Sequence, residues 1–183
     1  MRRIRGFFRG GLKRVLLAWI ALCMSIAALS VFAQSYQSLT SLLIDLSGWS
    51  AESAEGMDMD MSGMKSVTAA RDYEQGNKSI SAAIIAGFQM QGMWNPVYQE
   101  GFRMDTTQGT IAFENVKGFG VVHTFDKESR EGLIVVLIRE PTPDGSGGAV
   151  FAFEFEGLTM DEALKLSQKF DWASMKSAVS KLW

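Results

Sequence analysis

The sequence predicts an α+β domain in which an antiparallel meander sheet of about six or seven strands is flanked by an N-terminal and a C-terminal helix. Three observations lead to this expectation. Short β-branched and aromatic runs alternate with turn-like segments in the middle of the chain. Leucines recur at helical spacing before these runs. A capping-box pattern followed by apolar residues comes after them.

The chain begins with the pattern of an export signal. Residues 1–14 carry five Arg and one Lys but no acidic residue, and residues 15–33 carry no charge. A basic stretch and an apolar stretch that ends in Val-Phe-Ala before Gln34 are typical of a cleaved signal peptide. The uncharged run is also long enough to span a membrane, so an uncleaved anchor is the alternative. Contact with a membrane is expected only in that second case.

Either form places residues 34–183 outside the cytoplasm as one domain, periplasmic or secreted, or anchored to the inner membrane and facing the periplasm. The leader holds six of the eighteen basic residues and none of the twenty acidic ones, so the rest has a net charge of −8. A domain this acidic is not expected to bind nucleic acid. Cys23, the only cysteine, lies in the leader, so the domain has neither a disulfide nor thiol chemistry.

An N-terminal helix is predicted over the segment SYQSLTSLLIDLSGW, residues 35–49. Its leucines lie at i, i+3, i+4 and i+7 and would form one buried stripe. Gly48 would end the helix, and Trp49 would open the strand region. The stripe consists of Leu39, Leu42, Leu43 and Leu46.

The segment GMDMDMSGM, residues 56–64, places four methionines and two aspartates in nine positions. Methionines and polar residues alternate, which predicts a strand with sulfur on one face and carboxylate on the other. A three-residue loop over residues 62–64 would place Met59 opposite Val67 and Met57 opposite Ala69. The preferred interpretation is that the methionines are adaptable packing residues that fill an irregular core or the wall of a groove.

Two metal hypotheses compete with this packing interpretation. Thioether sulfur is a soft ligand that selects Cu(I), and the pattern resembles the methionine-rich segments of exported copper-handling proteins. The same stretch matches the opening D-x-D-x-S-G of a calcium loop, but Ala69 stands where the loop needs its bidentate glutamate. The Cu(I) ligands would be Met57, Met59, Met61 and Met64.

A hairpin is predicted where VTAARDY and KSISAAIIAG flank the turn Gln75-Gly76-Asn77. Four further strands are predicted in GTIAFENV, FGVVHTF, GLIVVLIRE and AVFAFEFE, joined as a meander. The last of these alternates strictly, so its phenylalanines should be buried while Glu154 and Glu156 face water. The buried residues would be Val67, Ala69, Tyr73, Ile80, Ala82, Ile84, Phe151, Phe153 and Phe155.

Residues 87–104, GFQMQGMWNPVYQEGFRM, interrupt the strand pattern with aromatic residues and methionines among glycines. Such a segment either caps the core or presents its side chains to a partner, since Trp, Tyr and Met are enriched in interfaces. Core capping is the preferred interpretation. The partner-binding residues would be Met93, Trp94, Tyr98 and Phe102.

A closing helix is predicted after Thr159, because Thr159 and Glu162 have the spacing of a capping box. Apolar residues at Ala163, Leu164, Leu166 and Phe170 would supply its buried positions, and Trp172, Met175 and Val179 suggest a final helical stretch.

The segments LSGW, AARDYEQGNKSISAAI and FEFEGLTMDEALKLSQKFDW resemble a group of small exported bacterial proteins of unknown function. The order of helix, meander and helix also loosely resembles the Mog1/PsbP-like α+β fold. The resemblance implies a sheet covered by helices, and it implies no functional residue.

No catalytic constellation is predicted. His123, the only histidine, shares a strand face with Val121 and Phe125, and no Gly-rich phosphate loop joins a strand to a helix. The sequence therefore predicts a non-enzymatic binding or assembly module of the bacterial cell envelope, without a cofactor and with an envelope protein as partner. The alternative is a periplasmic metal-handling protein that binds Cu(I).

Overall fold

A computed structural model describes residues 35–94, 101–142 and 147–182. The described residues belong to one compact unit, Ser35–Trp183, called the domain below. The predicted leader lies outside the described residues, as does Tyr98.

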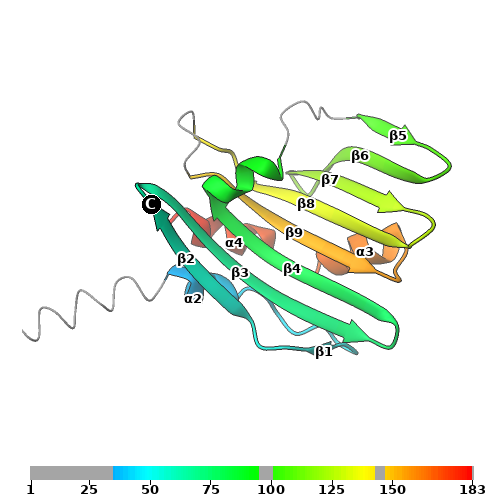
Figure 1. The fold of residues 1–183 in the computed structure, drawn as a ribbon, viewed down its shortest axis with the longest axis horizontal. Coiled ribbons are helices and arrows are strands. Elements are labelled where there is room, and N and C mark those ends of the chain that lie inside the picture. Colours follow the sequence, from blue (N-terminus) through cyan, green and yellow to red (C-terminus); the bar gives the residue numbers. More distant parts are fainter. Residues whose placement is uncertain (1–34, 95–100, 143–146, 183) are drawn as a thin grey trace, which may run out of the picture. The chain divides into compact units, whose positions relative to one another are not determined.

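This domain is an α+β fold built on one antiparallel nine-stranded sheet (Figure 1). One short helix precedes the strands, a 3-10 helix interrupts them and two helices follow. The elements are α2 (Ser35–Thr40), β1 (Ser50–Ala51), β2 (Glu55–Met61), β3 (Met64–Gln75), β4 (Lys78–Gly87), η1 (Phe88–Gly92), β5 (Arg103–Asp105), β6 (Gly109–Val116), β7 (Phe119–Asp126), β8 (Glu131–Arg139), β9 (Ala149–Glu156), α3 (Met160–Ser167) and α4 (Trp172–Val179).

The strand order along the sheet is β1-β3-β4-β9-β8-β7-β6-β5, and β2 also pairs with β3. Strands β5 to β9 form the predicted meander, which begins at the far edge and returns until β9 lies against β4. The prediction of six or seven strands is too low, because it misses the two shortest of the nine. Strands β1 and β5 have two and three residues, too few to show a period in the sequence.

The predicted hairpin is confirmed: β3 and β4 pair from Ser66↔Gly87 to Gln75↔Lys78 around the two-residue turn Gly76-Asn77. The alternation in β9 is confirmed as well, since its phenylalanines are buried and Glu154 and Glu156 are exposed. The capping box at Thr159 and Glu162 begins α3, and α4 buries the predicted apolar residues Trp172, Met175 and Val179.

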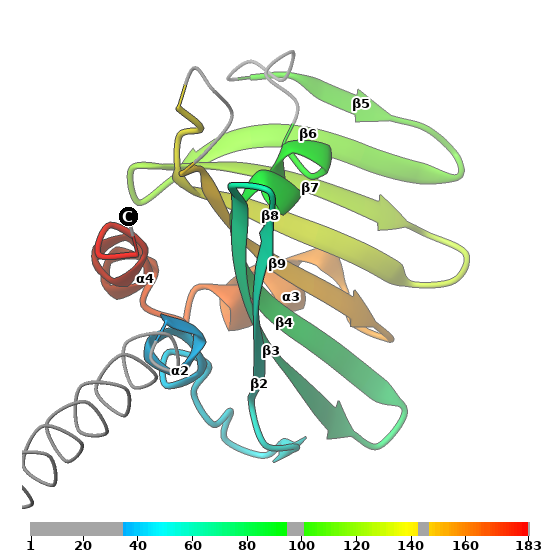
Figure 2. The same cartoon turned by 60° about the vertical axis from the view of Figure 1, so that its left-hand side comes forward.

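The two faces of the sheet differ in what covers them. Helices α2, α3 and α4 pack on one face, behind the sheet in Figure 1; in Figure 2, α2 and α4 stand to the left of the sheet. We call this the helix face, and the main core lies on it, including Tyr73, Ile84 and Phe151. The opposite side is the open face. The 3-10 helix η1 covers only its end near Gly87.

The N-terminal helix is shorter than predicted, because α2 ends at Thr40 and the chain continues in turns. Leu39, Leu43 and Leu46 are nevertheless buried, so the predicted stripe is real while the helix that should carry it is not. Hydroxyl groups of this serine-rich segment donate to nearby carbonyls, which competes with helix continuation. Side chains of β3 also take the carbonyls that a longer helix would use.

Two β3 side chains anchor the turns that follow α2. The guanidinium of Arg71 donates to the carbonyls of Leu43 (2.7 Å) and Glu52 (2.8 Å) and to the carboxylate of Asp45 (2.6 Å). The hydroxyl of Tyr73 donates to the carbonyl of Ile44 at 2.9 Å. Burial raises the pKa of Tyr73 to about 12, and the nearby Arg71 offsets this only partly.

This raised pKa predicts a loss of stability in alkali. The unfolded chain releases the Tyr73 proton near pH 10, whereas the folded protein releases it near pH 12. Stability from this group is therefore complete below pH 10 and is lost as the pH rises through 12. We expect the free energy of unfolding to fall by roughly 1 kcal/mol between pH 9 and pH 11 from this group. Urea titrations at both pH values should show a smaller fall for Tyr73→Phe, and an equal fall in both proteins would contradict the assignment.

Candidate functional site: the open face of the sheet

The register of the β2–β3 hairpin corrects the prediction for the methionine segment. Met61 pairs with Met64 across the two-residue turn Ser62-Gly63, so the loop does not include Met64. Both turn residues have positive φ, 56° and 89°, as a type I′ turn requires. Met59 consequently pairs with Ser66, and Met57 with Thr68.

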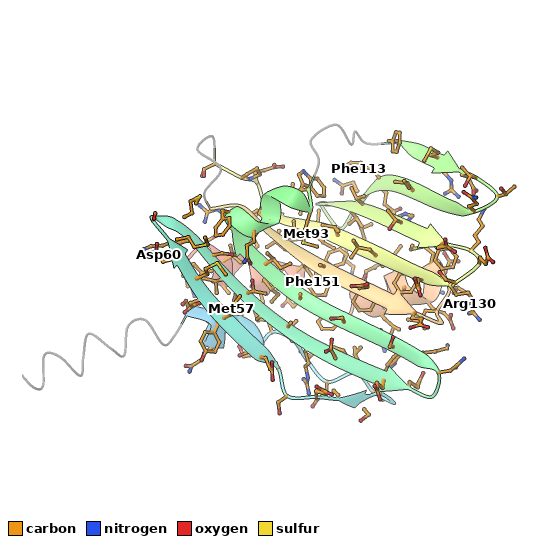
Figure 3. All side chains as sticks on the ribbon, viewed as in Figure 1. Met57, Asp60, Met93, Phe113, Arg130 and Phe151 are labelled. Carbon is orange, nitrogen blue, oxygen red and sulfur yellow. The ribbon has the colours of Figure 1, made fainter. Side chains whose placement is uncertain are left out.

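This shift of one residue moves the sulfur atoms to the other side of the sheet. Val67 and Ala69 point into the helix-face core, while Ser66 and Thr68 lie on the open face. The predicted register, which would turn the methionines toward the core with Val67 and Ala69, is therefore wrong. Met57 (labelled in Figure 3), Met61 and Met64 are 49%, 53% and 53% exposed, and Met59 is partly buried beside η1.

The aspartates between these methionines lie on the helix face, as the alternation predicts. Asp58 accepts a hydrogen bond from the Ser35 hydroxyl, and Asp60 accepts one from the Gly63 amide at 3.0 Å. Next to them, the Tyr36 ring packs so closely on Gly56 that an added Cβ would lie 2.3 Å from a ring atom. These residues form a tight hairpin and not a calcium loop.

At the end of β4 that lies beside this hairpin tip, η1 builds a small second core on the open face. Met90, Val135 and Val150 are buried there, and Met93 and Trp94 pack against them. The Trp94 ring meets the ring of Phe113, the residue labelled in Figure 3, edge to face with centroids 5.9 Å apart. The beginning of the 87–104 segment thus covers an apolar strip of the open face. Phe102, beside β5, is 43% exposed.

The rest of the open face changes from apolar to acidic along the strands. The cross-strand row next to η1 contains alanines and valines, including Ala83, Ala152 and Val135. Beyond it, the rows near the β3–β4 turn are rich in carboxylates and hydroxyls. They contain Asp72, Ser81, Glu154, Leu133, Thr124, Ile111 and Met104 in one row, and Glu74, Ser79, Glu156 and Glu131 in the next.

Two adjoining hollows, of about 520 and 470 Å³, lie over these acidic rows. Glu131 and Glu154 line both, so together they form one shallow trough that crosses the strands from β3 to β5. We call it the acidic groove. Its carboxylates are Glu52, Asp72, Glu74, Asp126, Glu131, Glu154 and Glu156.

The negative charge of the acidic groove is not neutralised from within. No lysine or arginine among the described residues lines either hollow. The nearest basic residues of β3 and β4 point to the helix face, where Arg71 pairs with Asp45 and Lys78 with Glu162. Within the described part of the chain, no three acidic or histidine side chains gather closely enough to hold a metal ion.

No pattern in the sequence predicts this groove as a whole. The signal was present in part, because Glu154 and Glu156 were expected to face water and Asp72 and Glu74 alternate with buried Tyr73. What could not be read was that β9 pairs with β4, which brings these four carboxylates together.

His123 lies on the helix face, as predicted, and is buried. Burial lowers the pKa of His123, and the Glu114 carboxylate, 3.5 Å from its Nε2, opposes this shift. The imidazole faces neither the acidic groove nor the methionines, so it contributes to neither site.

The fold and the site define a class of protein: an α+β domain with one sheet face covered by helices and the other left open to solvent. Within the described residues, none of the helices is long and apolar enough to cross a lipid bilayer. Comparison of the chain with protein-family models, curated proteins and solved structures finds no match. The resemblance to small exported bacterial proteins and to the Mog1/PsbP-like fold therefore stays a prediction.

Proposed function

We propose that this protein is a non-enzymatic binding module of the bacterial cell envelope, and that it holds a cationic amphipathic segment of a partner protein in the acidic groove. The observation that carries the proposal is the groove itself, which joins unneutralised carboxylates to apolar side chains on an open sheet face. The envelope location rests on the predicted leader.

Charge selects the class of partner. Seven carboxylates line the acidic groove, and they are too dispersed to bind a single ion, so a partner with several distributed positive charges suits them. Nucleic acid and anionic lipid are both repelled by such a surface. A basic polypeptide segment remains as the class of partner that the charge pattern favours.

The size and apolar part of the groove support the same class. It crosses seven strands, which spans about 29 Å at the usual spacing between strands. A helix of about 18 residues has a similar length, about 27 Å. Leu133, Ile111 and Met104 continue the groove toward β5, so the segment needs apolar as well as basic side chains.

The proposal predicts that the protein binds a fluorescein-labelled 18-residue peptide of Leu and Lys patterned as an amphipathic helix. Fluorescence anisotropy at low salt should detect binding, and 0.5 M salt should weaken it strongly by screening. Reversing two groove charges with Glu154→Lys and Glu156→Lys should weaken binding roughly tenfold, equivalent to about 1.4 kcal/mol.

Two controls separate groove binding from general attraction to an acidic protein. Glu140→Lys with Asp161→Lys changes the net charge equally, but both positions lie outside the acidic groove and should leave binding nearly unchanged. A peptide with Glu in place of Lys should not bind. Equal weakening by the two double variants, or equal binding of the two peptides, would contradict the proposal.

A further inference from the structure

The tip of the β2–β3 hairpin carries exposed thioethers, and neither the core nor the acidic groove uses them. Met59, Met61 and Met64 lie on the open face at the hairpin tip, and Met57 lies on the same face two residues further along β2. Large apolar side chains are mostly buried in folded proteins, so a group of half-exposed methionines on one hairpin needs an explanation. Leucine would provide the same apolar surface, so apolar area alone does not explain why these positions are methionines.

The hairpin register brings three of these sulfur atoms within reach of one point. Met61 and Met64 are directly opposite, with Cβ atoms about 5.5 Å apart, and Met59 is about 7 Å from Met61 along β2. Met59 and Met64 are diagonal neighbours at about 7–8 Å. A point above this triangle lies roughly 4 Å from each Cβ, a distance that a methionine side chain spans when its sulfur binds a metal.

We infer that Met59, Met61 and Met64 form a Cu(I) site, with Met57 as an adjacent thioether. Neutral thioethers are soft ligands that select Cu(I) over hard cations such as Mg²⁺ and Ca²⁺. They also carry no proton that a metal must displace, so binding should persist at mildly acidic pH. The aspartates of the same strand point to the opposite face and do not enter the site.

Two contacts hold the site in place while leaving it open. The Sδ atom of Met59 lies 3.9 Å from Nε2 of Gln89, and the Oγ1 of Thr68 lies 3.1 Å from Oε1 of the same Gln89. Through Gln89, η1 thus positions the inner sulfur against β3. Met61 and Met64 stay exposed at the turn, where a Cu(I) donor can reach them.

The Cu(I) site and the acidic groove lie at opposite ends of β3. Met64 and Glu74 are ten residues apart on this strand, which corresponds to roughly 33 Å. Substitutions at one site can therefore be made without touching the other, and the two proposals can fail separately.

The test is an anaerobic competition of the purified protein against bicinchoninate, a chromophoric Cu(I) chelator. The wild type should withdraw Cu(I) from the chelator at pH 7 and at pH 5.5. The variant Met59→Leu/Met61→Leu/Met64→Leu should withdraw none. Each single substitution should weaken Cu(I) binding by roughly 10- to 100-fold or more, because loss of even an outer-shell partner of a metal site costs that much. Ag(I) should compete, whereas Ca²⁺ and Zn²⁺ should not.

The control is Met160→Leu, because Met160 begins α3, packs on the helix face and belongs to neither proposed site. It should bind Cu(I) as the wild type does. The triple leucine variant should keep its circular dichroism and its affinity for the cationic peptide, since near-isosteric swaps preserve apolar surface. Absence of Cu(I) binding in the wild type, or equal binding in wild type and folded triple variant, would overturn the inference.

Discussion

Replacing Phe151 by Ala is expected to lower the free energy of unfolding by about 4 kcal/mol, the largest effect of any substitution considered for this protein. Phe151 lies in β9 between β4 and β8 at the centre of the sheet and is 0% exposed (Figure 3). Its ring is 5.1 Å from that of Phe170 and 6.2 Å from that of Phe153, measured between centroids. Truncation leaves a cavity lined by rings that cannot collapse easily.

Thermal and urea denaturation of the purified variant measure this effect, and the melting temperature should fall by roughly 10 °C. Glu154→Ala is the matched control on the same strand. Its side chain is exposed on the open face, so the change in stability should stay below about 0.5 kcal/mol. A Phe151→Ala protein as stable as this control would show that the helix-face core does not hold β9 as described.

Replacing Trp94 by Ala is expected to lower the free energy of unfolding by about 2 to 3 kcal/mol. This is below the range of about 3–5 kcal/mol for a fully buried aromatic residue, because Trp94 is only partly buried. The loss arises from the edge-to-face contact with Phe113 and from the cover of the second core around Met90. The same urea titration measures it.

The Trp94 result decides between the two interpretations of the 87–104 segment. A core cap predicts the destabilisation above together with stronger binding of a hydrophobic dye to the newly uncovered strip. An interface anchor predicts a melt close to that of the wild type. Phe102→Ala is the comparison, because Phe102 is more exposed and should cost less than about 1 kcal/mol.

The two proposed sites make different uses of one open sheet face. The acidic groove offers dispersed charge for a long partner, and the hairpin tip offers soft sulfur for a single ion. Leucine substitution at the methionines distinguishes them, because it removes sulfur while keeping apolar area. Charge reversal at Glu154 and Glu156 should have the converse effect, weakening peptide binding while leaving Cu(I) binding unchanged.

Local patterns in the sequence were sufficient for most elements. The strict alternation in β9, the turn residues around Gly76 and the capping box at Thr159 each depend on neighbours within a few residues, and the structure confirms all three. In the α2 region, local pattern predicts burial correctly but not the length of the helix. Its leucine stripe is buried as predicted, yet side chains of β3, about thirty residues away, end the helix early.

The methionine segment shows what local pattern leaves open. Alternation correctly separates sulfur from carboxylate, because successive side chains of a strand point to opposite faces. It does not say which face meets the helices, and a turn of two residues in place of three reverses the answer. The methionines therefore lie on the open face and not in the helix-face core.

By itself the sequence determined the α+β class, the acidic charge of the domain, the positions of the seven longer strands and the alternation that separates each strand's two faces. The tertiary structure alone decided the pairing of β9 with β4, the hairpin register and the side of the sheet that the helices cover. The physical reason is the separation along the chain of the residues that each feature depends on. Alternation, turns and caps depend on residues close along the chain, whereas the acidic groove and the methionine triangle depend on pairings between strands that only the folded sheet specifies.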